Sequence, residues 1–313
     1  SLEFPHFLAF LKVPAAVTQR YMQNAETQVH QQKEVPMNMN LPDSVTLNNG
    51  KSMPILGLGV FQSAEKTYDA VRCALELGYR HIDTASLYGN EEQVGRAVRD
   101  SGIPRSEIFV TTKIWNSEQR SHRQKEAFWA SMERLNLDYI DLYLLHWPVP
   151  ESFHESWAVL EELYDGKNLK SIGVSNFLEH HIDELMTTAK VKPAVDQVEV
   201  HPYNTKYELR QYLIEHQIAC EALSPLGRDN KELITDPRIG EIGQKYGKTI
   251  AQVILRWDVQ NGIITIPKSV HPDRIRQNSE IFDFELTAEE MLLIEQMNRN
   301  QLHEDPETFC NFY

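Results

Sequence analysis

Short apolar runs alternate with helical segments along most of this chain. The runs cover residues 55–61, 81–85, 108–113, 142–147, 171–176, 195–200, 219–224 and 263–268. The segments between them carry apolar residues at three- and four-residue spacing, as in residues 66–77, 123–135, 155–164, 180–188, 206–216, 237–246 and 249–260. Short strands that alternate with helices are typical of a parallel sheet. Eight such runs predict an α/β protein folded as a (β/α)8 TIM barrel.

A β-hairpin is expected ahead of the first run. Apolar residues flank the pair Asn49-Gly50 within residues 45–55. Asn-Gly is a strong hairpin signal because both central positions of its turn need positive φ. We expect this N-terminal hairpin to lie at the bottom of the barrel.

A doubly wound open sheet is the alternative to a barrel. Its dinucleotide-binding form begins with the pattern G-x-G-x-x-G after the first strand. Residues 57–61 read Gly-Leu-Gly-Val-Phe and lack the third glycine. No acidic residue ends a second strand at the expected distance, so the closed barrel is favoured.

Residues 1–40 form an extension that differs from the rest, and residues 41–313 are assigned to a single barrel domain. Apolar residues recur every four positions in the extension, at Val17, Tyr21, Ala25 and Val29. This spacing predicts a helix over about residues 17–33. We interpret the extension as a segment without a catalytic role. The alternative is a helix that docks on a neighbouring subunit, in a protein that is a monomer or a weak homo-oligomer.

Composition limits the classes of partner. The 313 residues carry a net charge of -14, whereas a protein that binds nucleic acid without sequence preference needs an excess of Lys and Arg. No apolar run approaches the ~18 residues of a membrane span. The three cysteines, Cys73, Cys220 and Cys310, are odd in number and widely spaced, as expected of reduced thiols in an intracellular protein. We therefore expect a cytoplasmic protein that binds neither nucleic acid nor membranes.

Each apolar run carries a polar or small residue at or near its C-terminal end. These residues are Gly59, Asp83, Lys113, His146, Ser175 with Asn176, Gln197, Ser224 and Lys268. In a barrel, the C-terminal ends of all strands meet at one mouth, where barrel enzymes keep their chemistry. Scattered polar residues would not fall at every strand end, so the pattern predicts a ligand site at this mouth.

Four residues near these ends suit the reduction of a carbonyl group. Hydride transfer to a carbonyl leaves an alkoxide that must be protonated, and Tyr88 can donate that proton. The ammonium group of Lys113 would lower the tyrosine pKa, and Asp83 would hold Lys113 charged and in place. His146 could hydrogen-bond the carbonyl oxygen. Each residue alone has a plainer role, as a helix cap, a solvated strand end or a packing residue, but their joint placement favours a carbonyl reductase.

The sequence resembles the aldo-keto reductase family from about residue 43 to residue 313. The motifs that carry the resemblance are residues 78–91 (GYRHIDTASLYGNE), 142–148 (LYLLHWP), 172–177 (IGVSNF) and 266–278 (IPKSVHPDRIRQN). The resemblance implies a catalytic tetrad, with the tyrosine as general acid, made of Asp83, Tyr88, Lys113 and His146. The chain is similar to short-loop, prokaryotic-type members that reduce small aldehydes, ketones, 2-oxoaldehydes or keto sugars, such as diketogluconate, methylglyoxal and prostaglandin F synthase-like reductases.

The resemblance also implies NADPH bound in an extended form across the barrel mouth, with NADH less favoured. The residues expected to contact this cofactor are Gly59, Val60, Asp83, Ser175, Asn176, Gln197, Leu223, Ser224, Pro225, Leu226, Gly227, Lys268, Ser269, Val270, Arg274, Gln277 and Asn278. Lys268 and Arg274, near a helix start, would form a positive pocket for the adenosine 2′-phosphate. The residues expected to face a small carbonyl substrate are Phe61, Tyr88, Trp115, His146 and Trp147. No spacing of possible ligands indicates a metal site.

Three features depart from the family pattern. Phe61 stands where related sequences commonly have Trp or Tyr, and Leu223 stands where an aromatic ring usually stacks on the nicotinamide. The C-terminal tail around residues 301–304 differs as well. Leu223 leaves open a second function, a cofactor-binding regulatory protein on the same fold. A third function, a barrel enzyme with a Schiff base on Lys113, needs a neutral lysine, which a neighbouring Asp83 would oppose.

Overall fold

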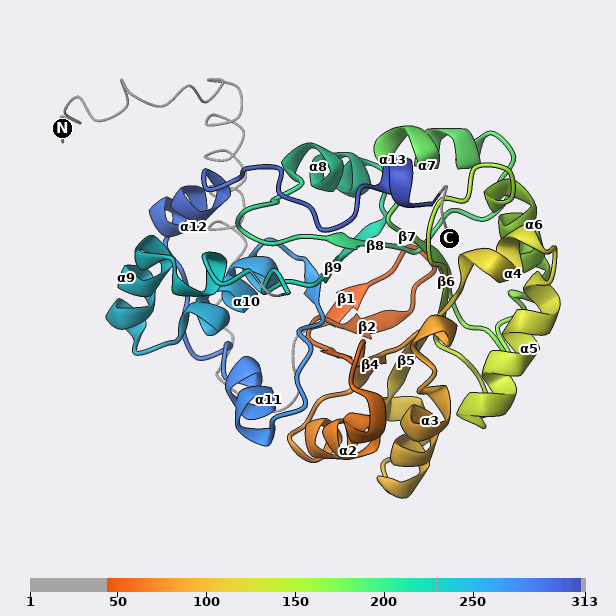
Figure 1. The fold of residues 1–313 in the computed structure, drawn as a ribbon, viewed down its shortest axis with the longest axis horizontal. Helices are drawn as coiled ribbons and strands as arrows, with labels where there is room; N and C mark the ends of the chain where they lie inside the picture. Colours follow the sequence, from red (N-terminus) through yellow and green to blue (C-terminus); the bar gives the residue numbers. More distant parts are fainter. Residues whose placement is uncertain (1–43, 229, 311–313) are drawn as a thin grey trace.

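The computed structural model describes residues 44–228 and 230–310, and it confirms the α/β barrel (Figure 1). Parallel strands pair in chain order as β3 (Leu58–Gly59), β4 (His81–Asp83), β5 (Phe109–Ile114), β6 (Leu142–Leu145), β7 (Ile172–Ser175), β8 (Val195–Glu199), β9 (Ala219–Leu223) and β10 (Ile264–Thr265). Parallel bridges from Leu56 to Thr265 and from Gly59 to Lys268 join the first strand to the last. The sheet is therefore closed, which the open-sheet alternative does not allow.

The first and last strands are shorter than predicted. The expected runs were residues 55–61 and 263–268, but β3 and β10 hold two residues each. The first run stops early because the chain turns at Phe61 and Gln62, and Gln62 has a φ of 53°. A Cβ on Gly59 would lie 2.9 Å from the carbonyl oxygen of Ile266. The close approach of the two backbones at the barrel closure is thus a sufficient reason for glycine at position 59, whether or not a ligand binds there.

Helices surround the barrel (Figure 1). They are α2 (Thr67–Glu76), α3 (Glu91–Asp100), α4 (Asn116–Arg120), α5 (Gln124–Leu135), α6 (Phe153–Leu163), α7 (Glu179–Met186), α8 (Tyr207–Glu215), α9 (Pro237–Tyr246), α10 (Ile250–Gln260), α11 (Pro272–Ser279), α12 (Ala288–Glu295) and α13 (Pro306–Phe309). The bounds of α9 are those predicted, whereas α3 lies outside the predicted segments. Its apolar stripe is narrow because Val94, Ala97 and Val98 stand among charged residues.

The predicted hairpin covers the bottom of the barrel. The side chain of Asn48 donates to the carbonyl oxygen of Pro193 at 2.7 Å, and that of Asn49 donates to the carbonyl oxygen of Lys170 at 3.2 Å. Both acceptors lie just before strands, so the hairpin meets the strands at their N-terminal ends. The hairpin consists of the antiparallel strands β1 (Ser44–Thr46) and β2 (Ser52–Pro54).

The turn of this hairpin differs from the expected two-residue form. The amide of Leu47 donates to the carbonyl oxygen of Lys51 at 2.8 Å, so three residues lie in the turn. Of the pair Asn49-Gly50, only Gly50 has positive φ, at 79°. A three-residue loop with glycine in the left-handed position is the next commonest hairpin connection.

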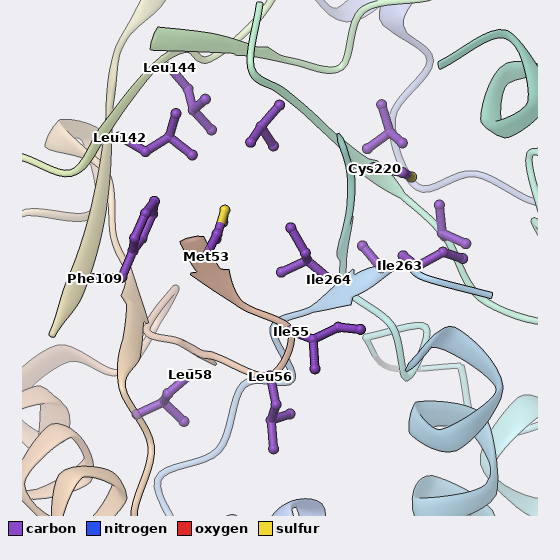
Figure 2. Packing of buried hydrophobic residues seen from close by; sticks show 14 of the residues in the cluster. Met53, Ile55, Leu56, Leu58, Phe109, Leu142, Leu144, Cys220, Ile263 and Ile264 are labelled. Carbon is purple, nitrogen blue, oxygen red and sulfur yellow. The ribbon is translucent and has the colours of Figure 1, made fainter. Parts of the chain in front are cut away.

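Met53 of the hairpin fills the lower end of the barrel interior. Its side chain is fully buried, and Figure 2 shows it among Phe109 of β5, Leu142 and Leu144 of β6, and Ile264 of β10. The core below the mouth is therefore packed with apolar side chains. Polar residues at the opposite strand ends are left to form the site.

Three further expectations concern the N-terminal extension, the cysteines and membrane-spanning helices. The extension of residues 1–40 and its helix over about residues 17–33 lie outside the described residues. Cys73, Cys220 and Cys310 are all free thiols. Among the helices of the described ranges, none is long and apolar enough to cross a membrane.

Candidate active site

A buried ion pair joins two neighbouring strands at the barrel mouth. The Nζ atom of Lys113 donates to the two carboxylate oxygens of Asp83, at 2.7 and 2.8 Å, and to the carbonyl oxygen of Thr84 at 2.8 Å. The Lys113 side chain is 0% exposed and that of Asp83 is 3% exposed. Burial opposes the charge on Lys113, but the attraction of Asp83 prevails and raises the lysine pKa. Lys113 is thus an ammonium group, which argues against Schiff-base chemistry.

A short turn after β4 holds Tyr88 over this pair. Tyr88 ends the 3-10 helix η3 (Ser86–Tyr88), and Gly89 follows it with a φ of 65°. The buried side chain of Asn90 accepts from the Thr84 hydroxyl at 2.6 Å and donates to the carbonyl oxygen of Val60 at 2.9 Å. These bonds fix the turn between two strand ends. As a result, the Nζ atom of Lys113 lies 5.2 Å from the centroid of the Tyr88 ring.

The pKa of Tyr88 differs in direction from the sequence expectation. The nearby ammonium was expected to lower it, but burial raises the pKa of Tyr88, and the charge of Lys113 only opposes that rise. The sequence places Lys113 close to Tyr88 but does not reveal the burial that raises the pKa of this half-buried phenol. Tyr88 is consequently a protonated phenol, which can donate its proton.

His146 follows β6 and completes the predicted tetrad. Its ring lies 5.9 Å from the ring of Tyr88 and 5.0 Å from that of Trp115, both edge to face. Burial, with the charge of Lys113, holds the pKa of His146 well below its ordinary value, so the imidazole is neutral. The Asn176 amide donates to the backbone oxygen of His146 at 3.0 Å and fixes this segment. The structure thus brings all four tetrad residues together.

Three predicted contacts of the nicotinamide lie on the adjacent strand ends. The Ser175 hydroxyl donates to the backbone oxygen of Gln197 at 2.8 Å, and the Asn176 amide donates to the Ser175 hydroxyl at 3.2 Å. Asn176 has a φ of 62°, which turns the chain sharply at the end of β7. The amide nitrogen of Gln197 donates to Asp83 at 2.8 Å. Hydrogen bonds within the protein therefore hold the side chains of Ser175, Asn176 and Gln197 in place.

The loop after β9 holds the next predicted contacts. The amide of Gly227 donates to the carbonyl oxygen of Ser224 at 2.8 Å, which closes a tight turn. Gly227 has a φ of 68°, a conformation that a residue with a side chain adopts only with strain. Leu223 and Ser224 are half-buried at the start of this loop, Leu226 is half-buried and Pro225 is buried.

The predicted phosphate-binding residues lie around the start of α11. Lys268 and Arg274 are exposed, and neither forms an ion pair with a described residue. Gln277 is also exposed, Val270 is half-buried, and Ser269 and Asn278 are buried. Two free cations beside a helix start can attract an anion even in an acidic protein.

Aromatic rings line the mouth around the tetrad. The ring of Phe61 lies 4.9 Å from that of Tyr88. Trp147 is buried because Phe309 of α13 packs on it, with ring centroids 4.3 Å apart. Phe309 also meets Trp115 at 6.5 Å. Sequence reasoning missed Phe309, since nothing near it in the chain indicates that the tail returns to the mouth.

Histidine and carboxylate pairs fasten this tail to the barrel. The Nδ1 atom of His303 lies 2.5 Å from Glu199 at the end of β8. The hydrogen bonds that Glu199 accepts lower the pKa of Glu199 to about 2, although burial opposes this shift. His201 also meets Glu199, at 3.1 Å. The His201 Nδ1 atom accepts from the amide of Tyr203 at 3.2 Å, so its proton sits on Nε2 and that nitrogen has no lone pair for a metal. The expectation that the protein holds no metal stays a prediction.

A second buried group was missed beneath the tetrad. Glu221 of β9 is fully buried and accepts from the Gln197 amide at 2.8 Å. His81 of β4 is fully buried as well, with Nε2 at 3.5 Å from Glu221. The sequence signal that could have revealed Glu221 was a charged residue in the middle of the apolar run 219–224.

Comparisons with known proteins identify the family of this chain. A sequence model described as Aldo/keto reductase family matches residues 55–299. The 9,11-endoperoxide prostaglandin H2 reductase of Trypanosoma cruzi is 48% identical over 277 residues, which cover 87% of this chain and 98% of that protein. The glyoxal reductase of Bacillus subtilis is 46% identical, over 85% of this chain and 96% of that protein.

Solved structures resemble the fold over the same region. The Bombyx mori aldo-keto reductase in complex with NADP superimposes with a TM-score of 0.79 at 36% identity, over 84% of this chain and 94% of that chain. An aldo/keto reductase from Brucella melitensis gives a TM-score of 0.78 at 45% identity, over 82% and 99% of the two chains. The chain therefore belongs to the aldo/keto reductase family of NAD(P)H-dependent oxidoreductases.

Proposed function

We propose that this protein is an NADPH-dependent reductase of small aldehydes and ketones, with 2-oxoaldehydes and keto sugars among its substrates. The observation that carries the proposal is the convergence of a protonated Tyr88, the Lys113 ammonium and a neutral His146 in one aromatic-lined mouth. The names of the two relatives, which specify reduction of glyoxal and of prostaglandin H2, support a carbonyl or related oxygen function as the acceptor.

NADPH, when bound, supplies the hydride that reduces the carbonyl carbon. Tyr88 donates the phenolic proton to the carbonyl oxygen as negative charge develops there. Burial keeps Tyr88 protonated before the reaction, and the Lys113 ammonium stabilises the phenolate that remains. The neutral imidazole of His146 orients the carbonyl oxygen toward Tyr88. Phe61 and Trp147 provide apolar walls that exclude water.

The choice of NADPH over NADH rests on the start of α11. Lys268 and Arg274 are exposed cations without a partner among the described residues, and they suit a 2′-phosphate. Ser175, Asn176 and Gln197 fit the nicotinamide end, since amide and hydroxyl groups can pair with its carboxamide. A cytoplasmic location is part of the proposal, because the described cysteines are free thiols.

A spectrophotometric assay tests the proposal. Purified protein would be mixed with NADPH and a panel of glyoxal, methylglyoxal, phenylglyoxal, a nitrobenzaldehyde, glyceraldehyde and xylose, and then with NADH in its place. We expect NADPH to be consumed with at least one carbonyl and NADH to be used less well. Binding of NADPH without turnover on any carbonyl would instead support a regulatory protein, and would make Leu223→Trp the first variant to examine.

A further inference from the structure

A buried carboxyl group is linked to Asp83 of the tetrad through the amide of Gln197. Glu221 is 0% exposed, and the register of β8 and β9 pairs it with Gln197. Paired residues on parallel strands present their side chains to the same face. The Oε2 atom of Glu221 consequently accepts from the Gln197 amide nitrogen at 2.8 Å.

The Gln197 amide has both of its hydrogens bound to carboxyl groups. Its nitrogen donates to Glu221 Oε2 and to Asp83 Oδ2, each at 2.8 Å. Turning the amide over would place its carbonyl oxygen against the carboxylate of Asp83, which can only accept, so this orientation is the favoured one. Its carbonyl oxygen remains as the acceptor, and no described residue donates to it.

We propose that Glu221 is a positioning residue for the nicotinamide: together with Asp83, it holds the amide hydrogens of Gln197 and so presents the Gln197 carbonyl oxygen to an amide hydrogen of the cofactor's carboxamide. This inference rests on the proposed function, because it requires a nicotinamide cofactor at the mouth. Asp83 already serves Lys113 with both of its oxygens. Glu221 is therefore the partner dedicated to the orientation of Gln197.

The charge around Glu221 agrees with this role. Burial, and next the charge of Asp83, raise the pKa of Glu221 to about 8, so the group is a neutral acid near neutral pH. Its other neighbour, His81, is also neutral, since burial lowers the pKa of His81 to about 3. A neutral Glu221 still accepts from Gln197, yet it adds no second negative charge beside the Asp83–Lys113 pair.

Two ligands separate this role from a general effect on the barrel. NADPH contains the nicotinamide, whereas 2′,5′-ADP contains only the adenosine and phosphate end. Isothermal titration calorimetry would give the Kd of each ligand for the wild type, Glu221→Leu and Glu221→Gln. Asp258→Asn is the matched control, because Asp258 is a buried carboxyl group that binds Thr265 and lies away from the tetrad.

We expect Glu221→Leu to raise the Kd of NADPH about 10-fold, the loss of roughly one good hydrogen bond, and to leave the Kd of 2′,5′-ADP unchanged. Glu221→Gln keeps a carbonyl acceptor for Gln197 and should restore the affinity for NADPH. Asp258→Asn should change neither Kd.

The inference is wrong if Glu221→Leu binds NADPH as the wild type does, or if it loses both ligands equally. If that variant does not fold, Glu221→Met takes its place. Gln197→Leu gives a further check: adding Glu221→Leu to it should weaken NADPH binding no further, and an additive loss would overturn the role. The proposed cofactor preference would be contradicted if the wild type bound neither 2′,5′-ADP nor NADPH more tightly than NADH. That result would leave the comparison of the Glu221 variants valid.

Discussion

Replacing Lys113 with Met would leave Asp83 without its cation inside the barrel. Lys113 makes hydrogen bonds of 2.7, 2.8 and 2.8 Å from a side chain that is 0% exposed. After the change, Gln197 would remain the only described donor to that carboxylate. Removing one partner of a buried ion pair costs about 3–5 kcal/mol. We expect Lys113→Met to lower the free energy of unfolding by that amount.

A second variant separates the unpaired charge from lost packing. Asp83→Asn combined with Lys113→Met removes both charges, and replacing a whole buried pair costs far less than breaking it. We expect the double variant to recover at least half of the lost stability. Urea unfolding, followed by circular dichroism near neutral pH, measures both. The reasoning fails if Lys113→Met costs less than about 1 kcal/mol, or if the double variant is less stable than the single one.

Three further changes probe other parts of the account. A Cβ on Gly95 of α3 would lie 1.8 Å from the carbonyl oxygen of Leu135 in α5. Gly95→Ala should therefore destabilise the protein by about 3 kcal/mol in thermal unfolding. An unchanged Tm would show that α3 and α5 can move apart without cost. Phe309→Ala should raise KM for carbonyl substrates, because it removes the ring that packs on Trp147, and should leave the Kd of NADPH unchanged. A KM equal to that of the wild type would show that the C-terminal tail does not form part of the substrate pocket. Because the folded-state pKa of Glu221 is about 8, above its ordinary value of 4.5, the contribution of Glu221 to the stability of the wild type falls as pH rises from 4.5 to 8. Glu221→Gln lacks this titration, so its stability relative to the wild type should grow over that window in urea unfolding, and a constant difference would mean that Glu221 titrates normally.

The tetrad could be predicted from the sequence because each member stands at or just beyond the end of an apolar run. Lys113 ends its run and His146 stands one residue before the end of its run, and the barrel brings the ends of the strands together. The barrel itself followed from the alternation of runs and helices. The short strands at the closure were misjudged, since Phe61 continues the apolar pattern although the chain has already turned there.

Other parts of the site depend on distances that a linear pattern does not contain. The pairing of Glu221 with Gln197 requires the register of two strands. The place of Phe309 requires the path of a tail held by His303 and Glu199. The direction of the Tyr88 pKa depends on the balance between burial and a nearby charge, and only the charge was visible in the sequence.

The most direct test of the central claim compares the wild type with Tyr88→Phe in the NADPH consumption assay. The variant keeps the ring that packs on Phe61 and removes only the acidic hydroxyl. We expect the rate of carbonyl reduction to fall by about 10²- to 10⁴-fold, the usual contribution of a general acid, with the Kd of NADPH unchanged. Carbonyl reduction at the wild-type rate would show that another group delivers the proton and would contradict the assignment of Tyr88.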